Sequence, residues 1–154
     1  MKSRLALNVL LAALGIVGCG TANYRDASSD SKYEGLVGQT IKLQDEFMVQ
    51  GVTLPGSAPH TVDQYDITPK PGFSNRYVPL RKPLPAGTEL RILKVEECTN
   101  CFGFSDIQLL VAPPESQYAD HKVFLLPDFG ETPLLVEEGG RAVFRSPLVQ
   151  VLPK

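Results

Sequence analysis

The sequence has little net charge and few of the side chains that most often perform chemistry. Its 154 residues have a formal net charge of −2, so no overall basic field favours binding to nucleic acid. Only two His and three Cys are present, and no G-x-S-x-G, H-E-x-x-H, phosphate-loop or dinucleotide motif occurs. Gly and Pro number 13 each, which disfavours long uninterrupted helices. We therefore predict neither catalysis nor a cofactor, and no nucleic-acid partner.

Long hydrophobic runs are also scarce, and the clearest one lies near the amino terminus. Residues 5–17 are apolar except for Asn8, and Lys2 and Arg4 precede them. As a helix this run spans about 20 Å, which is short of the ~30 Å hydrocarbon core of a bilayer. A charged start, a short apolar region and small residues near a cleavage point are typical of a secretory signal peptide. We place this signal peptide at residues 1–18.

The end of this run carries a second signal. Ile16, Val17, Gly18 and Cys19 are an aliphatic, a variable and a small residue followed by Cys. This pattern resembles the lipobox of bacterial lipoproteins, whose usual first residue is Leu. The resemblance implies cleavage before Cys19, diacylglycerol on its sulfur and a further acyl chain, such as palmitate, on the new amino terminus. Because Gly20 follows the Cys where an Asp resembles an inner-membrane retention signal, the outer membrane is favoured, with the protein facing the periplasm.

Residues 19–34 would join the lipidated Cys19 to the rest of the chain. They are small, polar and charged and show no apolar period, which predicts a flexible tether. A tether of this length has a root-mean-square reach of about 20 Å. The folded domain is then expected over residues 35–154.

From residue 35 onward, short β-prone runs alternate with turns rich in Gly, Pro, Asn and Asp. Residues 85–96 begin with a Pro-x-Gly turn and then alternate with apolar side chains on both faces, which predicts a central strand. Residues 104–112 follow as a second strand, so the two are expected to form a hairpin with its tip at 97–103. A further strand is expected to contain a bulge at Gly51.

These runs predict an all-β domain of six to eight short strands, arranged as a small barrel or a β-sandwich. Residues 83–88, with their prolines and the Gly that enters an alternating strand, resemble a feature of bacterial SH3-like barrels. The resemblance favours the barrel.

Cys98 and Cys101 are separated by two residues at the expected hairpin tip. The ends of a four-residue turn lie close enough for a disulfide, and two Cys remain once Cys19 is lipidated, so we predict that these two are bonded. A thiol–disulfide oxidoreductase would use the same pair, but it usually needs a helix after a strand to lower the thiolate pKa. A zinc site would need two further ligands, and we predict no metal.

Basic residues concentrate in one stretch of the chain. Residues 67–94 hold six Lys or Arg and one acid, Glu89. A basic face of this kind would suit an anionic partner, and the candidates in turn and extended segments are Lys70, Arg76, Arg81 and Lys82.

Together these patterns predict a lipid-anchored protein of the bacterial cell envelope. Its small non-enzymatic domain is expected to bind or support a partner, namely an envelope protein, peptidoglycan or another glycan. The alternative is a periplasmic thiol–disulfide oxidoreductase that uses Cys98 and Cys101.

Overall fold

The computed structural model describes residues 22–73, 75, 77–101 and 105–153, and these residues form an all-β fold. The predicted fold class is therefore confirmed, although the described residues hold eleven strands rather than six to eight. The strands are β1 (Tyr24–Asp26), β2 (Thr40–Leu43), β3 (Phe47–Val52), β4 (Gln64–Pro69), β5 (Leu80–Leu84), β6 (Glu89–Cys98), β7 (Ile107–Val111), β8 (Lys122–Leu125), β9 (Leu135–Glu138), β10 (Arg141–Phe144) and β11 (Val149–Val151). Two single-turn 3-10 helices, η1 (Ser31–Tyr33) and η2 (Ser116–Tyr118), complete the described elements.

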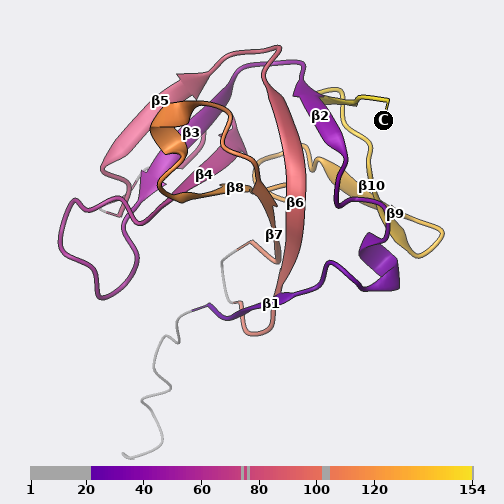
Figure 1. Cartoon of the computed structure of the whole chain (residues 1–154), viewed down its shortest axis with the longest axis horizontal. Coiled ribbons are helices and arrows are strands. Elements are labelled where there is room, and N and C mark those ends of the chain that lie inside the picture. Colours follow the sequence, from indigo (N-terminus) through magenta and orange to yellow (C-terminus); the bar gives the residue numbers. More distant parts are fainter. Residues whose placement is uncertain (1–21, 74, 76, 102–104, 154) are drawn as a thin grey trace, which may run out of the picture.

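Nine of the strands form one sheet in the order β11-β2-β6-β7-β8-β4-β3-β5, with β1 added beside β6. Figure 1 shows how this sheet curves, so that β5, β3 and β4 lie on one side and β6 and β2 on the other. Most pairs are antiparallel, whereas β4 and β8 run parallel. The strands β9 and β10 form a separate hairpin. As predicted, β6 is central, because β7 pairs along one of its edges while β2 and β1 share the other.

The core lies on the inner face of the curved sheet. Side chains of successive strand residues point to opposite faces, so each strand contributes alternate apolar residues to this face. In β7, for example, Leu109 and Val111 are buried together. Fully buried core residues in the other strands include Ile41, Leu43, Phe47, Val49, Ile67, Leu90, Ile92, Val95 and Leu125.

The bulge expected at Gly51 is not found, and the irregularity lies in β6 instead. Gly51 stays in regular register opposite Tyr65. A Cβ at Gly51 would lie 2.8 Å from the Val62 side chain, so the close approach of the next loop explains this Gly. In β6 the register shifts between Ile92 and Lys94. As a result Leu93 is 45% exposed whereas Val95 is buried. Strict alternation would instead place these two side chains on the same face.

The expected tether is wrong for the residues that the structure describes, because this segment is part of the fold. β1 pairs with the end of β6, and the Ala27 N–H donates to the Val95 carbonyl at 2.9 Å. Ala27 and Tyr33 are buried in the core, and η1 packs against β10. The apolar residues of this polar segment are scattered, so they produce no period in the sequence. The segment nevertheless forms backbone hydrogen bonds with the N–H and C=O groups at the edge of β6. The folded domain therefore begins before residue 35.

No helix in the described part of the chain is both long and apolar enough to cross a membrane.

Candidate functional site

The cysteine turn joins β6 to the loop before β7. Cys98 is the last residue of β6, and it forms a disulfide with Cys101 across a Cα–Cα distance of 5.7 Å. The Cys98 N–H donates to the Asp106 carbonyl at 2.8 Å, which closes the hairpin behind the disulfide. The predicted pairing and its place at a hairpin tip are both confirmed.

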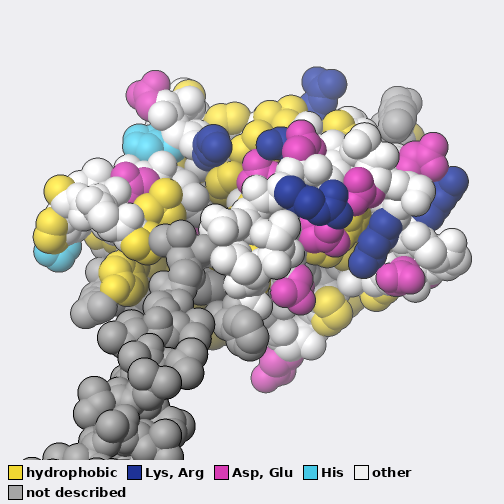
Figure 2. All heavy atoms as spheres, turned by 90° about the horizontal axis from the view of Figure 1, so that it is seen from below, with side chains coloured by type: hydrophobic (Ala, Val, Ile, Leu, Met, Phe, Trp, Pro, Cys, Tyr) yellow, Lys and Arg dark blue, Asp and Glu magenta, His cyan; other side chains and the backbone are white. Residues whose placement is uncertain are grey.

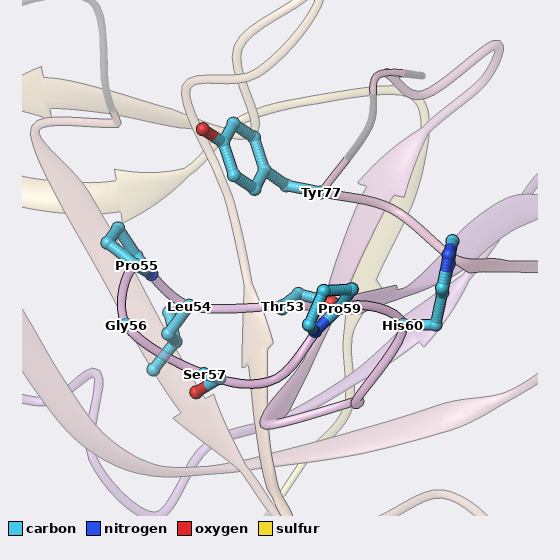
Figure 3. Close-up of a pocket in the computed structure, with 8 residues that line it drawn as sticks. All are labelled: Thr53, Leu54, Pro55, Gly56, Ser57, Pro59, His60 and Tyr77. Carbon is cyan, nitrogen blue, oxygen red and sulfur yellow. The ribbon is translucent and has the colours of Figure 1, made fainter.

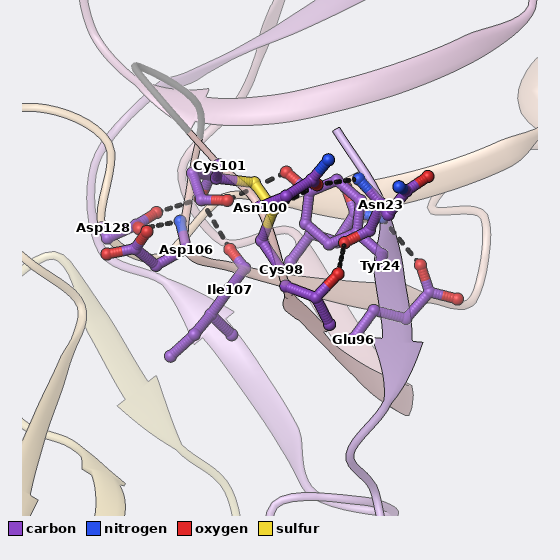
Figure 4. Close-up of a disulfide and its surroundings, with 12 residues drawn as sticks. Asn23, Tyr24, Glu96, Cys98, Asn100, Cys101, Asp106, Ile107 and Asp128 are labelled. Carbon is purple, nitrogen blue, oxygen red and sulfur yellow. Dashed lines mark hydrogen bonds between the residues drawn. A yellow bond between two sulfur atoms is a disulfide. The ribbon is translucent and has the colours of Figure 1, made fainter. Parts of the chain in front are cut away.

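This turn forms hydrogen bonds with the backbone of Asn23, near the start of the described chain. The Thr99 N–H and the Thr99 hydroxyl both donate to the Asn23 carbonyl, at 2.8 and 3.1 Å. The Asn23 N–H in turn donates to Asn100 Oδ1 at 2.6 Å (Figure 4). We call this arrangement of the 98–101 turn around Asn23 the Asn23 clasp. The disulfide stiffens the clasp, and β1 continues directly from it.

Acidic groups and a tyrosine surround the clasp (Figure 4). The Tyr24 hydroxyl donates to the Ser105 carbonyl at 2.8 Å, and Asp128 accepts the Asp106 N–H at 2.8 Å. Burial, followed by the negative charges of Asp66, Asp128, Asp106 and Glu96, raises the pKa of Tyr24 to about 12. Tyr24 therefore stays protonated and keeps donating its hydrogen bond across the physiological pH range.

Among the residues that the structure describes, the disulfide does not lie at the start of a helix. Thiolates of low pKa commonly sit at a helix N-terminus or beside a cation. Here Cys98 ends a strand, and neither of the two single-turn helices in the described residues carries a Cys. The described residues also hold no group of three His, Cys, Asp or Glu side chains that is placed to bind a metal ion.

The basic candidates that the structure describes have different local partners. Lys70 pairs with Glu46, and Arg81 donates to the Pro71 carbonyl. Lys82 follows Arg81 along β5, so its side chain leaves from the opposite face, and its Nζ lies 3.4 Å from Gln117 Oε1. Arg76 lies outside the described residues, as does Cys19.

A second feature, which the sequence analysis treated only as a loop, is a hollow beside residues 53–63. Its volume is about 460 Å³, and it is lined by Thr53, Leu54, Pro55, Gly56, Ser57, Pro59, His60 and Tyr77. Figure 3 shows the loop curling round, with Tyr77 approaching from a separate segment. We call this feature the Tyr77 groove. Leu54 and Tyr77 remain 42% and 41% exposed, although both have large apolar surfaces.

Hydrogen bonds hold the loop that forms the Tyr77 groove. The Thr53 N–H donates to the Tyr77 carbonyl at 2.8 Å, and the Leu54 N–H donates to Asp63 Oδ2 at 2.7 Å. The Thr53 hydroxyl reaches the Thr61 carbonyl at 2.5 Å. His60 has a φ of 66°, a left-handed conformation that is uncommon outside Gly. The groove is thus preformed by the fold.

A buried amide holds the segment that leads to Tyr77. Gln50 Oε1 accepts hydrogen bonds from the Thr68 hydroxyl at 2.9 Å and the Phe73 N–H at 3.1 Å, and its Nε2 donates to the Phe73 carbonyl. Gly72 passes so close that a Cβ there would lie 2.5 Å from Gln50 Oε1, and its φ is +71°. Phe73 then packs on Phe129, with ring centroids 5.3 Å apart.

The Tyr77 groove is neutral, whereas much of the neighbouring surface is charged. None of its lining residues is Asp, Glu, Lys or Arg. Figure 2 looks at the end of the domain that carries β1, and there acidic and basic side chains intermingle on the right while hydrophobic ones gather on the left. The signal for this groove in the sequence was weak, because two prolines and a Tyr in loops are common in any β protein. No protein-family model, curated protein or solved structure matches the chain.

Proposed function

We propose that this protein is a lipid-anchored component of the bacterial cell envelope, and that its non-enzymatic β domain binds a neutral glycan in the Tyr77 groove. The observation that carries the anchor is the lipobox-like pattern that ends in Cys19, five residues before β1 begins at Tyr24. The outer membrane is favoured because Gly20 follows the Cys. Diacylglycerol and an amide-linked acyl chain together exceed the two signals that stable anchoring requires.

The size and chemistry of the groove favour a glycan over a protein partner. Small-ligand sites commonly enclose roughly 300–1,000 Å³ and combine apolar walls with a few polar groups. The groove encloses about 460 Å³, with a Tyr ring, two prolines, a Ser and a His among its lining residues. A tyrosine presents a flat apolar face and a polar tip, which suits the apolar face and hydroxyls of a sugar ring. The sugar backbone of peptidoglycan is the envelope glycan that we select.

Cys19→Ala tests the anchor. The variant should remain an uncleaved precursor without acyl chains, because the lipidated sulfur is lost. Mass spectrometry of the amino-terminal peptide from the membrane fraction measures both changes. An unmodified Cys19 in the mature wild-type protein would contradict the proposal.

Tyr77→Ala tests the groove. The expected result is a loss of most co-sedimentation with purified peptidoglycan sacculi, because the aromatic wall is removed while the strands remain. Val151→Ala is the matched control, since Val151 is also 41% exposed and lies on β11 rather than in the groove. Both variants should keep the circular dichroism spectrum of the wild type.

Equal binding of sacculi by Tyr77→Ala and the wild type would overturn the glycan site. A wild type that ignores sacculi but forms a Tyr77-dependent photo-cross-link to an envelope protein would replace the glycan with a protein partner.

A further inference from the structure

The Asn23 clasp limits how far the domain can move from its anchor. This inference rests on the proposed lipidation of Cys19. Four Cα–Cα steps separate Cys19 from Asn23, and an extended chain covers at most about 3.6 Å per step, or about 14 Å in all. A tether of residues 19–34 would have allowed a wider range. Instead, Asn23 is already held by three hydrogen bonds to the cysteine turn.

The clasp lies at one end of the domain. β6 has ten residues, and at roughly 3.3 Å per residue its two ends are about 30 Å apart. Cys98 and the clasp are at one end of this strand, whereas the turn at residues 85–88 leads into the other. Figure 1 shows β1 and the cysteine turn at the bottom of the domain and the β5–β6 turn at the top.

We propose that the end of the domain formed by the Asn23 clasp and β1 is its membrane-facing surface, and that it meets the headgroup layer of the bilayer that holds the Cys19 lipids. The chain from Cys19 to Asn23, which we call the leash, is at most about 14 Å long. This is only half of the ~30 Å length of β6, so the turn at 85–88 reaches the headgroups only if the domain tips over. The clasp is the first part of the fold on the leash, which makes it the nearest part in an upright domain.

Charge does not produce this orientation. The clasp end carries the carboxylates of Asp26, Asp106 and Asp128, which anionic headgroups would repel. Its ion pairs are internal, because Arg25 binds Asp30 and Glu97. The short leash therefore sets the orientation, and a zwitterionic bilayer is the appropriate surface for testing it.

The orientation leaves the Tyr77 groove accessible. The loop of residues 53–63 projects from the side of the domain, at the left of Figure 1. A glycan strand that runs parallel to the membrane could reach this side without passing beneath the clasp end.

Photo-cross-linking to lipids tests the proposal. The full lipidated protein is purified from membranes and reconstituted into phosphatidylcholine vesicles that contain a headgroup-diazirine phosphatidylcholine. After illumination, mass spectrometry maps the cross-linked peptides. We expect adducts at residues 22–26 and 97–101 in several-fold excess over those at residues 85–89.

A flexible spacer is the matched control. An insertion of about twelve Gly and Ser residues between Gly20 and Thr21 leaves the lipidation signal and the clasp unchanged but lengthens the leash to a reach of about 20 Å or more. This variant should bind vesicles equally well and lose most of the excess.

Two failures can be told apart. An unmodified Cys19, with the protein free of the vesicles, would overturn the proposed anchor and this orientation together. A lipidated, vesicle-bound protein with equal adducts at both ends, or with the same excess in the spacer variant, would overturn the orientation alone.

Discussion

Asp66 is an ionisable residue at the centre of the sheet that no cation neutralises among the described residues. It lies in β4, is 6% exposed and accepts a hydrogen bond from Gln64 Nε2 at 2.8 Å. Burial raises the pKa of its carboxyl from 3.8 to about 7, against the smaller opposing effect of the Gln64 hydrogen bond. The folded protein therefore holds this proton at a pH where the unfolded chain has released it.

The sign of the resulting pH dependence follows from this difference. Below about pH 4 both states are protonated, so Asp66 contributes no dependence. Between about pH 4 and 7 the unfolded state loses the proton first, so the free energy of unfolding falls as pH rises. Above about pH 7 the penalty is constant, and at 1.36 kcal/mol per pKa unit it amounts to at most about 4 kcal/mol.

Asp66→Asn should remove this dependence. The amide oxygen can still accept from Gln64, and no charge is buried at high pH. Urea denaturation at pH 4, 6 and 8 should show a variant of similar stability at pH 4 and of greater stability than the wild type at pH 8. A variant that is less stable than the wild type at pH 8 would show that the ionised carboxylate is favourable in the fold.

Sequence reasoning at this scale succeeds where spacing alone fixes the geometry. Two Cys separated by two residues at a hairpin tip have one obvious partner each, and their disulfide was predicted. Asp66 has a polar neighbour at Gln64 and follows ordinary strand alternation, which places it on the outer face of β4. Whether Asp66 is buried therefore depends on which loops cover that face. That covering is a tertiary property that no local pattern encodes.

Among the elements, the cysteine turn has a local structural role. It closes a four-residue ring, for which the loop-entropy expression gives only about 2 kcal/mol. Its larger consequence is positional, because Thr99 and Asn100 hold Asn23 at the start of β1.

Cys98→Ser combined with Cys101→Ser should keep the fold and lower the free energy of unfolding by about 2 kcal/mol. Hydrogen exchange should accelerate at the Asn23 and Thr99 amides, because the turn that orders them is loosened, while β3 and β4 remain protected. Urea denaturation and amide exchange measure the two effects. A wholly unfolded double variant, or unchanged exchange at both amides, would contradict this role.

The edge strand β5 offers a structural explanation for part of the basic stretch. Among the described residues β5 pairs only with β3, so no described strand pairs with its other edge. Lys side chains and Pro are common on such edges, because they prevent another strand from adding to the sheet. Arg81, Lys82 and Pro83 occupy three of the five positions of β5. In the sequence, Pro83 belongs to the run of residues 83–88 that resembles a feature of SH3-like barrels, whereas in the structure it lies in an edge strand, where Pro is chiefly tolerated.

Most other strands followed from alternation, and the departures have physical causes. The β6–β7 hairpin was predicted because residues 85–96 carry apolar side chains on both faces and a second β-prone run, residues 104–112, follows them. The bulge near Leu93 was missed, because strict alternation in the sequence conceals a shift that the neighbouring strands impose. β1 was missed because its polar residues reveal no buried face until β6 supplies the partner edge.

At the scale of the whole molecule, the domain boundary decides how the protein is connected to its anchor. The sequence places the boundary at residue 35, since the preceding residues lack an apolar period. The structure instead uses that segment between β6 and the β9–β10 hairpin. Arg141 pairs with Glu34 at 2.9 Å, and Tyr33 donates from its hydroxyl to Glu97 at 2.9 Å.

A chain of residues 35–154 should therefore lose cooperative folding, whereas one of residues 22–154 should keep it. The shorter chain lacks Ala27 and Tyr33, both buried, and it uncovers the edge of β6 that β1 pairs with. Removal of one large buried aromatic commonly costs about 3–5 kcal/mol, a large part of the roughly 5–15 kcal/mol that stabilises a typical domain. Both chains are exported to the periplasm with a non-lipidated signal, so that the disulfide can form, and are compared by urea denaturation. If the two chains unfolded at the same urea concentration, residues 22–34 would be dispensable and the leash to the membrane correspondingly long.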